Sequence, residues 1–367
     1  MSLLVNILDT YYMAGLWKGL SPVATFFRDR YFPTEAGDIF AADKVLVEYQ
    51  DGAHGMAPFM VERAEPIPVA RQGYEIHDYA PVCLKQSRNL TVDDLKKRGF
   101  GEAILSNSTE EERAAKLVAD DLALLERRFT RAEELLCVNT MLNNGFSVNE
   151  MLDANTIGNV ATVQYYDSTQ GNDGIYTIQS ADRWATNTAW SVIVGHVRAM
   201  CRELSRRGLP AQDLIVGQAV ADILLANSDF QKLVDRNSGI VIASPIVQQL
   251  TAYDGVSLLG IVNFGGYNLN VIVVDEQYKT LSGGQMVWTN YFPAKGIMVT
   301  APSCGHMMYA HIVHMDENGD VETIAGKRVP DLYVNRRQKI RELILESRPL
   351  AAPKNYSPWI YAANAVS

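Results

Sequence analysis

The chain lacks three features that would assign it to common classes of protein. Nowhere in its 367 residues do about 20 consecutive apolar residues occur, so no segment is predicted to span a membrane. The four cysteines are widely spaced and form no Cys-x-x-Cys pair, which indicates reduced thiols rather than a disulfide framework. The first 20 residues carry Asp9 inside their apolar run and have no small-residue cleavage site, so they do not resemble a secretory signal.

Positive charge is also in short supply. Lys and Arg number 33 against 42 Asp and Glu, and the net charge of −9 argues against a nucleic-acid groove as the main function. A hydrophobic content of 47% with 20% charged residues is typical of a folded soluble protein. The length allows two or three core-bearing units.

Motifs for catalysis and nucleotide binding are missing as well. No G-x-S-x-G, H-E-x-x-H or G-x-G-x-x-G sequence occurs. Leu281–Gln285 reads LSGGQ, the signature of ABC-type ATPases, and Val271–Glu276 resembles a Walker B strand, but their order is reversed. The Gly326-Lys327 pair has Val321 in place of the first glycine of a phosphate-binding loop. We therefore predict no catalytic residue and no cofactor, with a nucleotide-binding ATPase as a remote alternative.

One cluster of cysteine and histidine residues has the composition of a metal site. Cys304, His306, His311 and His314 fall within eleven residues. If they lay on one strand, His306 and His314 would be roughly 26 Å apart at about 3.3 Å per residue, too far for a single ion. We therefore predict no metal ligand among them.

The most distinctive feature that is present is a long amphipathic segment. Ser108 to Leu142 predicts one helix of about 35 residues and roughly 50 Å, with a capping box at Ser108 and Glu111 and Gly145 as the terminating residue. One apolar seam repeats at intervals of four and three residues: Val118, Leu122, Leu125, Phe129, Ala132 and Leu136. A coiled coil is the alternative, although the heptad does not continue outside this segment.

Two segments in the first quarter of the chain predict extensions from the folded core. Residues 1–40 carry clustered aromatic side chains that need a surface to dock on. Residues 43–85 contain four prolines that exclude helix and central sheet, so they predict a projecting β-loop. Its strands are expected at Lys44–Tyr49 and from Phe59 onward.

Helices and strands are mixed after the long helix, which indicates the α+β class. The predicted elements are helices at Asn187–Arg207, Ala219–Ser228 and Phe230–Arg236, strands at Leu214–Val216, Val256–Val262 and Leu269–Val274, and a hairpin joining Ala310–Met315 to Val321–Ile324 through Asn318-Gly319.

Several blocks, taken in order, resemble the lambda-type major capsid proteins of tailed bacteriophages, the family called major capsid protein E. The blocks are FFRDRYFP (26–33), DIFAADKVLVEYQDG (38–52), APFMVER (57–63), ADRW (181–184), RRGLPAQDLIVGQAVADILL (206–225), YDGVSLLG (253–260), NLNVIVVDEQY (268–278) and ESRPL (346–350). With the long helix they span most of the chain, and their order and spacing carry the resemblance.

The resemblance implies a fold and a layout. The fold is the Hong Kong 97-type capsid fold, an α+β architecture. Its expected parts are an N-terminal arm at 1–40, an E-loop at 41–86, a P-domain at 87–186 with the spine helix at 108–142, an A-domain at 187–330, and a C-terminal return to the P-domain at 331–367. Six residues of the arm and the loop are expected to pack between subunits: Phe26, Phe27, Phe32, Pro33, Pro58 and Phe59.

It also implies a function and partners. The expected protein is structural, and its copies form pentamers and hexamers that close into an icosahedral shell. Implied partners are a separate scaffolding protein, because no long helical segment precedes the arm, a portal protein, a possible decoration protein and packaged double-stranded DNA. The expected location is the virion, after assembly in the host cytoplasm. An encapsulin-like bacterial compartment is the alternative, and co-purified DNA or an enzyme cargo would discriminate between them.

Overall fold

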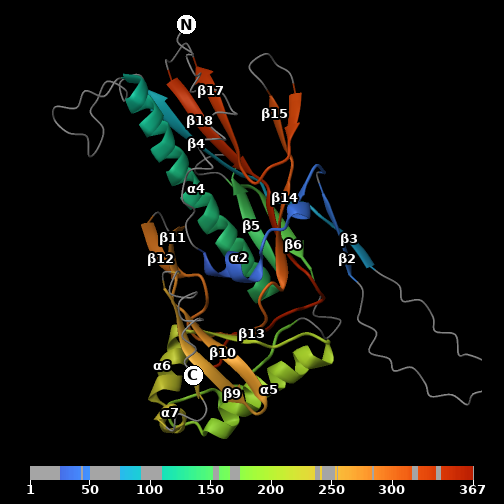
Figure 1. The fold of residues 1–367 in the computed structure, drawn as a ribbon, viewed down its shortest axis with the longest axis vertical. Helices are drawn as coiled ribbons and strands as arrows, with labels where there is room; N and C mark the ends of the chain where they lie inside the picture. Colours follow the sequence, from blue (N-terminus) through green and yellow to red (C-terminus); the bar gives the residue numbers. More distant parts are fainter. Residues whose placement is uncertain are drawn as a thin grey trace, which may run out of the picture.

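The protein's structure is a computed structural model, shown in Figure 1. It describes residues 25–42, 44–49, 75–91, 110–151, 157–165, 174–235, 240–241, 253, 255–282, 285–315, 321–335 and 340–366. Within these residues, no helix is both long enough and apolar enough to cross a membrane.

A single long helix, α4 (Glu110–Asn143), runs diagonally through the upper half of the molecule (Figure 1). It agrees with the predicted 108–142 to within two residues, although Ser108 of the capping box lies outside the described residues. Its last turn ends differently from the prediction, because Asn144 and not Gly145 takes the left-handed conformation, with φ of 54°. Gly145 instead opens the next strand, where an added Cβ would lie 2.1 Å from the carbonyl oxygen of Val163.

The apolar seam of α4 faces a three-stranded antiparallel sheet of order β17-β18-β4. Its strands are β4 (Leu84–Thr91), β17 (Val329–Asn335) and β18 (Ile340–Ser347). The seam residues that are buried are Val118, Leu122, Leu125, Phe129 and Leu136, while Ala132 is half-buried. Four of them join Leu90, Leu343 and Leu345 in one cluster. The helix is therefore held in place because its one narrow apolar stripe packs against a face of this sheet.

A second unit forms the lower half of Figure 1 around a six-stranded sheet of order β20-β13-β7-β10-β9-β8. Its strands are β7 (Asp213–Gly217), β8 (Ile240–Val241), β9 (Val256–Phe264), β10 (Tyr267–Val274), β13 (Ile297–Thr300) and β20 (Ile360–Ala362). Only β7 and β10 pair in parallel. Alternate strand residues point to opposite faces, so Leu214 and Val216 pack with helices α5 and α6 while Ile215 joins the core above the sheet.

Three helices accompany this sheet: α5 (Trp190–Arg206), α6 (Gln218–Ala226) and α7 (Ser228–Asp235). Helix α5 ends where predicted, because Gly208 adopts φ of 72° and Pro210 follows. The short helices that the sequence placed at Ala219–Ser228 and Phe230–Arg236 are also present, shifted by one or two residues.

Helix α2 (Phe26–Tyr31) and a small sheet join the two halves. The sheet has the order β1-β14-β19, with β1 (Ile39–Phe40) parallel to β14 (Gly305–Ala310) and β19 (Pro349–Pro353) antiparallel to it. A short 3-10 turn, η1 (Ala36–Asp38), leads from α2 to β1, and another, η3 (Ser180–Asp182), precedes α5.

The remaining strands form four two-stranded hairpins. They are β2 (Val45–Tyr49) with β3 (Glu75–Tyr79), β5 (Gly145–Met151) with β6 (Ile157–Gln164), β11 (Gln277–Ser282) with β12 (Gln285–Asn290), and β15 (Ile312–Met315) with β16 (Val321–Ile324). The β2–β3 pair extends from one side of the molecule (Figure 1). The prediction of strands on both sides of Asn318-Gly319 is confirmed, although the turn itself lies outside the described residues.

The C-terminal segment contributes strands to more than one sheet. Strand β18 lies in the sheet against α4, whereas β20 pairs with β13 in the six-stranded sheet. Likewise β14, β15 and β16, expected within 187–330, pair away from that sheet. Strand β19, which lies between β18 and β20 in the sequence, pairs with β14.

Candidate functional site

The most densely bonded site in the described structure is the junction where α2 crosses α4. Helix α2 has no capping side chain of its own. Instead, both carboxylate oxygens of Glu134, on α4, accept hydrogen bonds from backbone N–H groups of α2, at 2.7 Å from Phe27 and 2.9 Å from Arg28. A carboxylate in this position satisfies the free N–H groups of the helix start and complements its dipole. Glu134 of α4 therefore caps α2, a role that a Ser or Asp at the helix start has in most helices.

The Glu134 carboxyl group is fully buried, and its surroundings change its acidity. Burial raises the pKa of Glu134 to about 8, against the lowering effect of the two backbone hydrogen bonds. The nearby Glu276 carboxylate adds to the increase. The folded chain therefore holds the Glu134 proton more tightly than the unfolded chain does.

Replacing Glu134 by Gln is expected to change how stability depends on pH. An unfolded Glu134 loses its proton near its ordinary pKa of 4.5, whereas the folded one holds it to about 8, so the native chain loses stability as the pH rises between these values. The wild-type free energy of unfolding should therefore fall by about 2 kcal/mol between pH 5 and pH 7 relative to Glu134→Gln. Urea unfolding at the two pH values measures this, and parallel profiles for both proteins would contradict the assignment.

Next to Glu134, Glu133 binds two arginines inside the protein. Its side chain is fully buried and pairs with Arg28 at 3.1 Å and with Arg328, which also contacts Glu126 at 2.9 Å. Burial alone would raise the pKa of Glu133, but the charge and hydrogen bonds of Arg328 bring it below its ordinary value. This ion network ties α2, α4 and the start of β17 together.

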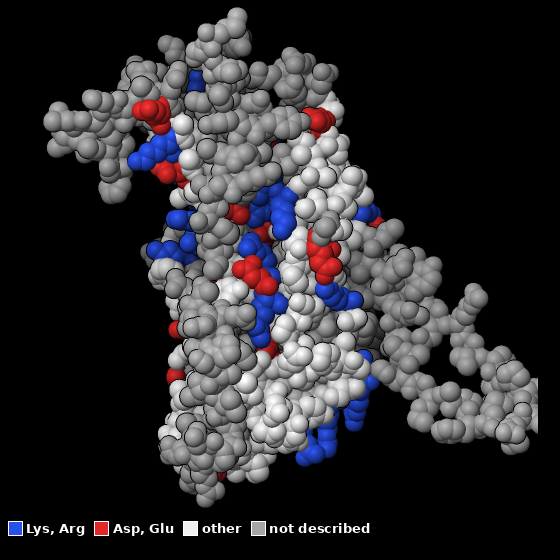
Figure 2. All heavy atoms as spheres, in the orientation of Figure 1, with Lys and Arg blue, Asp and Glu red and all other residues white. Residues whose placement is uncertain are grey.

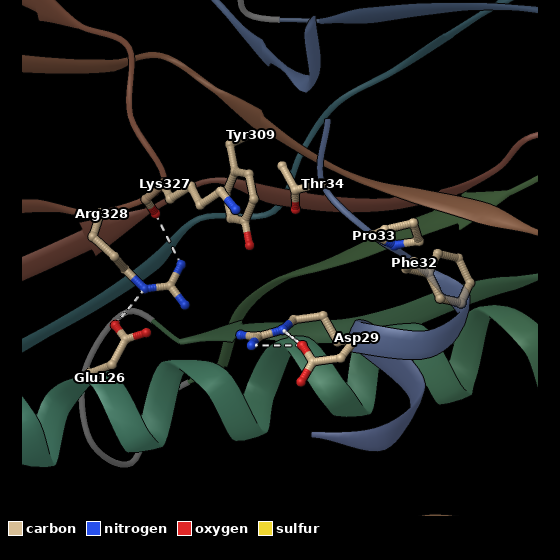
Figure 3. A pocket seen from close by; sticks show the side chains of 9 residues that line it. Asp29, Phe32, Pro33, Thr34, Glu126, Tyr309, Lys327 and Arg328 are labelled. Atoms are coloured by element: carbon tan, nitrogen blue, oxygen red, sulfur yellow. Dashed lines mark hydrogen bonds and ion pairs between the residues drawn. The ribbon is translucent and has the colours of Figure 1, made fainter. Parts of the chain in front are cut away.

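A pocket of about 340 Å³ opens beside this network. Figure 3 shows Arg328 reaching toward Glu126 on α4, with Lys327 and Tyr309 on the opposite wall. The Lys327 ammonium lies over the Tyr309 ring, 5.6 Å from its centroid. Three cationic residues (Arg28, Lys327 and Arg328) and two acidic ones (Asp29 and Glu126) line the pocket, so its charges are partly compensated.

A second buried carboxylate fastens α2 to the six-stranded sheet. Asp213, at the start of β7, is completely buried and accepts hydrogen bonds from Arg30 Nε at 2.7 Å and Arg30 Nη2 at 2.9 Å. The Tyr31 hydroxyl at 3.0 Å and the Asn270 amide at 2.8 Å complete its shell. The bidentate arginine gives this contact a fixed geometry.

The aromatic residues of α2 lie within the subunit, which corrects the prediction that they pack between subunits. Phe26, Phe27 and Phe32 are at most 1% exposed. Phe27 stacks on Phe292 at 6.2 Å, and Phe32 lies 5.9 Å from Trp359. The docking surface that these aromatic side chains require is therefore supplied by the chain's own core.

The other three residues expected to pack between subunits have different positions. Pro33 is half-buried and lines the pocket beside Arg328. Pro58 and Phe59 lie outside the described residues.

Exposed apolar side chains gather instead on the hairpins. On β12, Met286, Val287 and Trp288 are 63%, 45% and 61% exposed, and on the β15–β16 hairpin Val313 and Val321 are 59% and 65% exposed. A two-stranded hairpin is marginally stable without a further partner. These surfaces are therefore suited to contact another protein chain.

The motifs that sequence analysis weighed for chemistry fall in structural settings. Leu281 and Ser282 end β11, and Ser282 pairs with Gln285 at the start of β12, while Gly283 and Gly284 lie outside the described residues. His306 lies 3.4 Å from Asp38, and His314 lies 3.8 Å from Asp331 on a different sheet. Among the residues that the structure describes, no three His, Cys, Asp or Glu side chains are grouped to hold a metal ion.

The charged residues of the junction were missed by sequence analysis. Glu133 and Glu134 stand beside the seam positions Ala132 and Leu136, outside the predicted apolar seam. Asp213 was placed just before a buried strand and given no role. Acidic residues next to apolar positions were the available signal, but the partners that bury them are more than 100 residues distant in sequence.

A family model matches nearly the whole chain, and solved structures share its fold. A sequence model described as phage major capsid protein E matches residues 9–364. A prophage protein of E. coli CFT073 assigned as its capsid protein is similar in structure, with a TM-score of 0.65 at 15% identity over 98% of this chain and 99% of the other. A phage-related protein of Bordetella bronchiseptica RB50 has a TM-score of 0.51 at 11% identity, covering 98% and 97%. A search of curated protein sequences gave no match.

Proposed function

This chain belongs to the phage major capsid protein E family, and from that membership we propose that its copies assemble as pentamers and hexamers into a closed icosahedral shell around double-stranded phage DNA. The match over residues 9–364 carries the proposal, because it covers the arm, the long helix and both sheet units. As a major capsid protein the chain is a structural component of the virion, and its fold is that of Hong Kong 97-type capsid proteins.

The hairpins support self-association. They combine unpaired strand edges with exposed valine, methionine and tryptophan side chains, a combination that soluble monomers avoid. By contrast, the junction at α2 is buried and charged within one subunit. We propose that the junction fixes the shape of the subunit and that the hairpins contact neighbouring subunits.

The partners and location follow from the same proposal. A separately encoded scaffolding protein guides assembly in the host cytoplasm, a portal protein occupies one vertex, and a decoration protein is an optional addition. The chain acts without catalysis and without a cofactor.

Electron microscopy of the chain expressed together with the phage's scaffolding protein tests the proposal. Closed shells or rings of five and six subunits are the expected result. A protein that stays monomeric with and without scaffold would contradict it. Shells that hold an enzyme cargo and no DNA under phage infection would favour the encapsulin-like alternative instead.

Replacing Trp288 by Ala is expected to impair assembly while leaving the subunit folded. The side chain is 61% exposed, so its loss changes the free energy of unfolding little, whereas an aromatic residue at the centre of an interface contributes about 2 kcal/mol or more. The subunit concentration needed for assembly should rise more than about tenfold. Sedimentation measures this. Leu124→Ala is the control, because Leu124 is exposed among the charged residues of α4; an equal effect of both changes would contradict the role of the hairpin.

A further inference from the structure

The exposed face of α5 is predominantly positive. Arg198, Arg202 and Arg206 recur every four residues and all are exposed. The opposite face, with Ile193 and Val197 among its residues, is buried against the six-stranded sheet. Figure 2 shows Lys and Arg side chains gathered at the lower edge of the molecule, where Figure 1 places α5. This positive face stands out on a chain whose net charge is −9.

Two of these arginines are free to bind an anion. Arg198 and Arg202 make no hydrogen bond or ion pair with any residue that the structure describes. Arg206 contacts Glu203 at 3.1 Å, and Glu203 is shared with Arg207 at 3.4 Å. The acidic side chain therefore lies toward the end of the helix and leaves the guanidinium groups of Arg198 and Arg202 uncompensated.

The turn beside α5 extends this surface without adding negative charge. The β9–β10 turn contains Gly265 and Gly266, with φ of 63° and 106°, flanked by the exposed amides of Asn263 and Asn268. A Cβ at Gly265 would lie 3.0 Å from Cδ of Arg198, so the glycine lets the arginine stem lie against the turn. Asn263 is bonded within the turn, accepting from the Gly266 N–H at 3.0 Å and donating to Asn268 Oδ1 at 2.7 Å, so the turn adds an uncharged surface that does not repel a phosphate.

The exposed face of α4 differs in this respect. It carries Arg127, Arg128 and Arg131, but Glu112 and Asp120 lie on the same exposed side. The two helices therefore offer comparable numbers of exposed arginines. The one acidic residue among those of α5, Glu203, pairs with Arg206 and Arg207, which leaves Arg198 and Arg202 without an acidic partner among the described residues.

We propose that the α5 face, formed by Arg198, Arg202 and Arg206 with the β9–β10 turn, binds the phosphate backbone of double-stranded DNA and so faces the interior of the shell. The inference rests on the proposed function. Arginines four residues apart on a helix are about 6 Å apart along its axis, close to two phosphate steps of about 3.4 Å on one DNA strand. Guanidinium groups bind phosphate in a bidentate manner, and uncharged neighbours add no base-specific contact, which suits a container for any sequence.

Fluorescence anisotropy with the unassembled full-length chain and a labelled DNA duplex of random sequence tests this. Wild-type affinity should fall between about 50 mM and about 200 mM salt. The double variant Arg198→Glu with Arg202→Glu should bind more weakly, with a salt slope smaller by about two, since each neutralised phosphate contributes about 0.9. The control is Arg127→Glu with Arg131→Glu, which makes the same charge change at the same spacing on α4 and should retain wild-type binding.

Each other outcome overturns the inference. Equal losses in both double variants would show that total charge, and not the α5 face, sets the affinity. Unchanged DNA binding together with failed shell assembly in the α5 variant would assign these arginines to a contact with an acidic neighbouring subunit. The anisotropy needs no shell, so failure of the wild-type chain to assemble would count against the proposed function and leave this measurement intact.

Discussion

Leu125→Asp is expected to leave no folded subunit. The Leu125 side chain is 1% exposed and lies in the cluster formed by the α4 seam and the sheet strand β18, beside Leu343 and Leu345. An ionised carboxylate there has no partner in the cluster, and its burial costs more than about 4 kcal/mol. Since the whole stability of a protein is about 5–15 kcal/mol, and the lost leucine packing adds to the cost, the native state should not survive. Soluble yield and circular dichroism melting measure the outcome.

The neighbouring residue provides a matched control. Leu124 is 41% exposed on the charged side of the same helix, so Leu124→Asp adds the same charge one position away without burying it. That variant should be soluble and melt close to the wild type. A folded Leu125→Asp protein, or an equal loss in both variants, would mean that the seam does not hold α4 to its sheet.

Asp213→Ala is expected to cost about 3–5 kcal/mol, the second largest effect. The substitution removes the acceptor of Arg30, Tyr31 and Asn270 at once, and leaves the Arg30 guanidinium without its counter-charge. Removing one partner of a buried pair is costly because the remaining charge stays desolvated. Urea unfolding with tryptophan fluorescence measures the loss.

Two further variants separate the causes. Asp213→Asn keeps the shape of the side chain and loses the charge, so its cost should be smaller. Asp222→Ala removes an exposed carboxylate of α6 and should lie within about 0.5 kcal/mol of the wild type. If Asp213→Ala were as mild as Asp222→Ala, the carboxylate would not be what fastens α2 to the sheet.

The long helix was predictable because its determinants are local. The spacing of Val118, Leu122, Leu125 and Phe129 defines a helical face whatever lies against it, and α4 was placed to within two residues at its described ends. Its C-terminus was missed by one residue, because Asn tolerates the left-handed conformation and Asn144 precedes the glycine. Glycine adopts the left-handed conformation more readily than asparagine, so the sequence favoured Gly145 as the terminating residue of the helix. In the structure Gly145 begins β5, where an added Cβ would clash with the carbonyl oxygen of Val163.

The position of α2 was not predictable, because its determinants are distant in sequence. FFRDRY has aromatic residues that must be covered, and nothing in the segment says whether the same chain or a neighbour covers them. The answer depends on Phe292 and Trp359, and on carboxylates at positions 134 and 213. Pairing of β4 with β18, about 250 residues apart by their numbers, was beyond reach for the same reason.

The capping of α2 by α4 also dictates an order of events during synthesis. Six residues are too few for a helix to persist in water, and the groups that stabilise α2 lie 106, 107 and 183 residues further along the chain. The segment therefore lacks its ion-pair and stacking partners until Asp213 and Phe292 have been translated, and Phe32 lacks its contact until Trp359 follows. The packing around α2 and Phe32 is therefore completed only after the C-terminal part of the chain has been synthesised, so a truncated translation product cannot acquire the finished subunit shape.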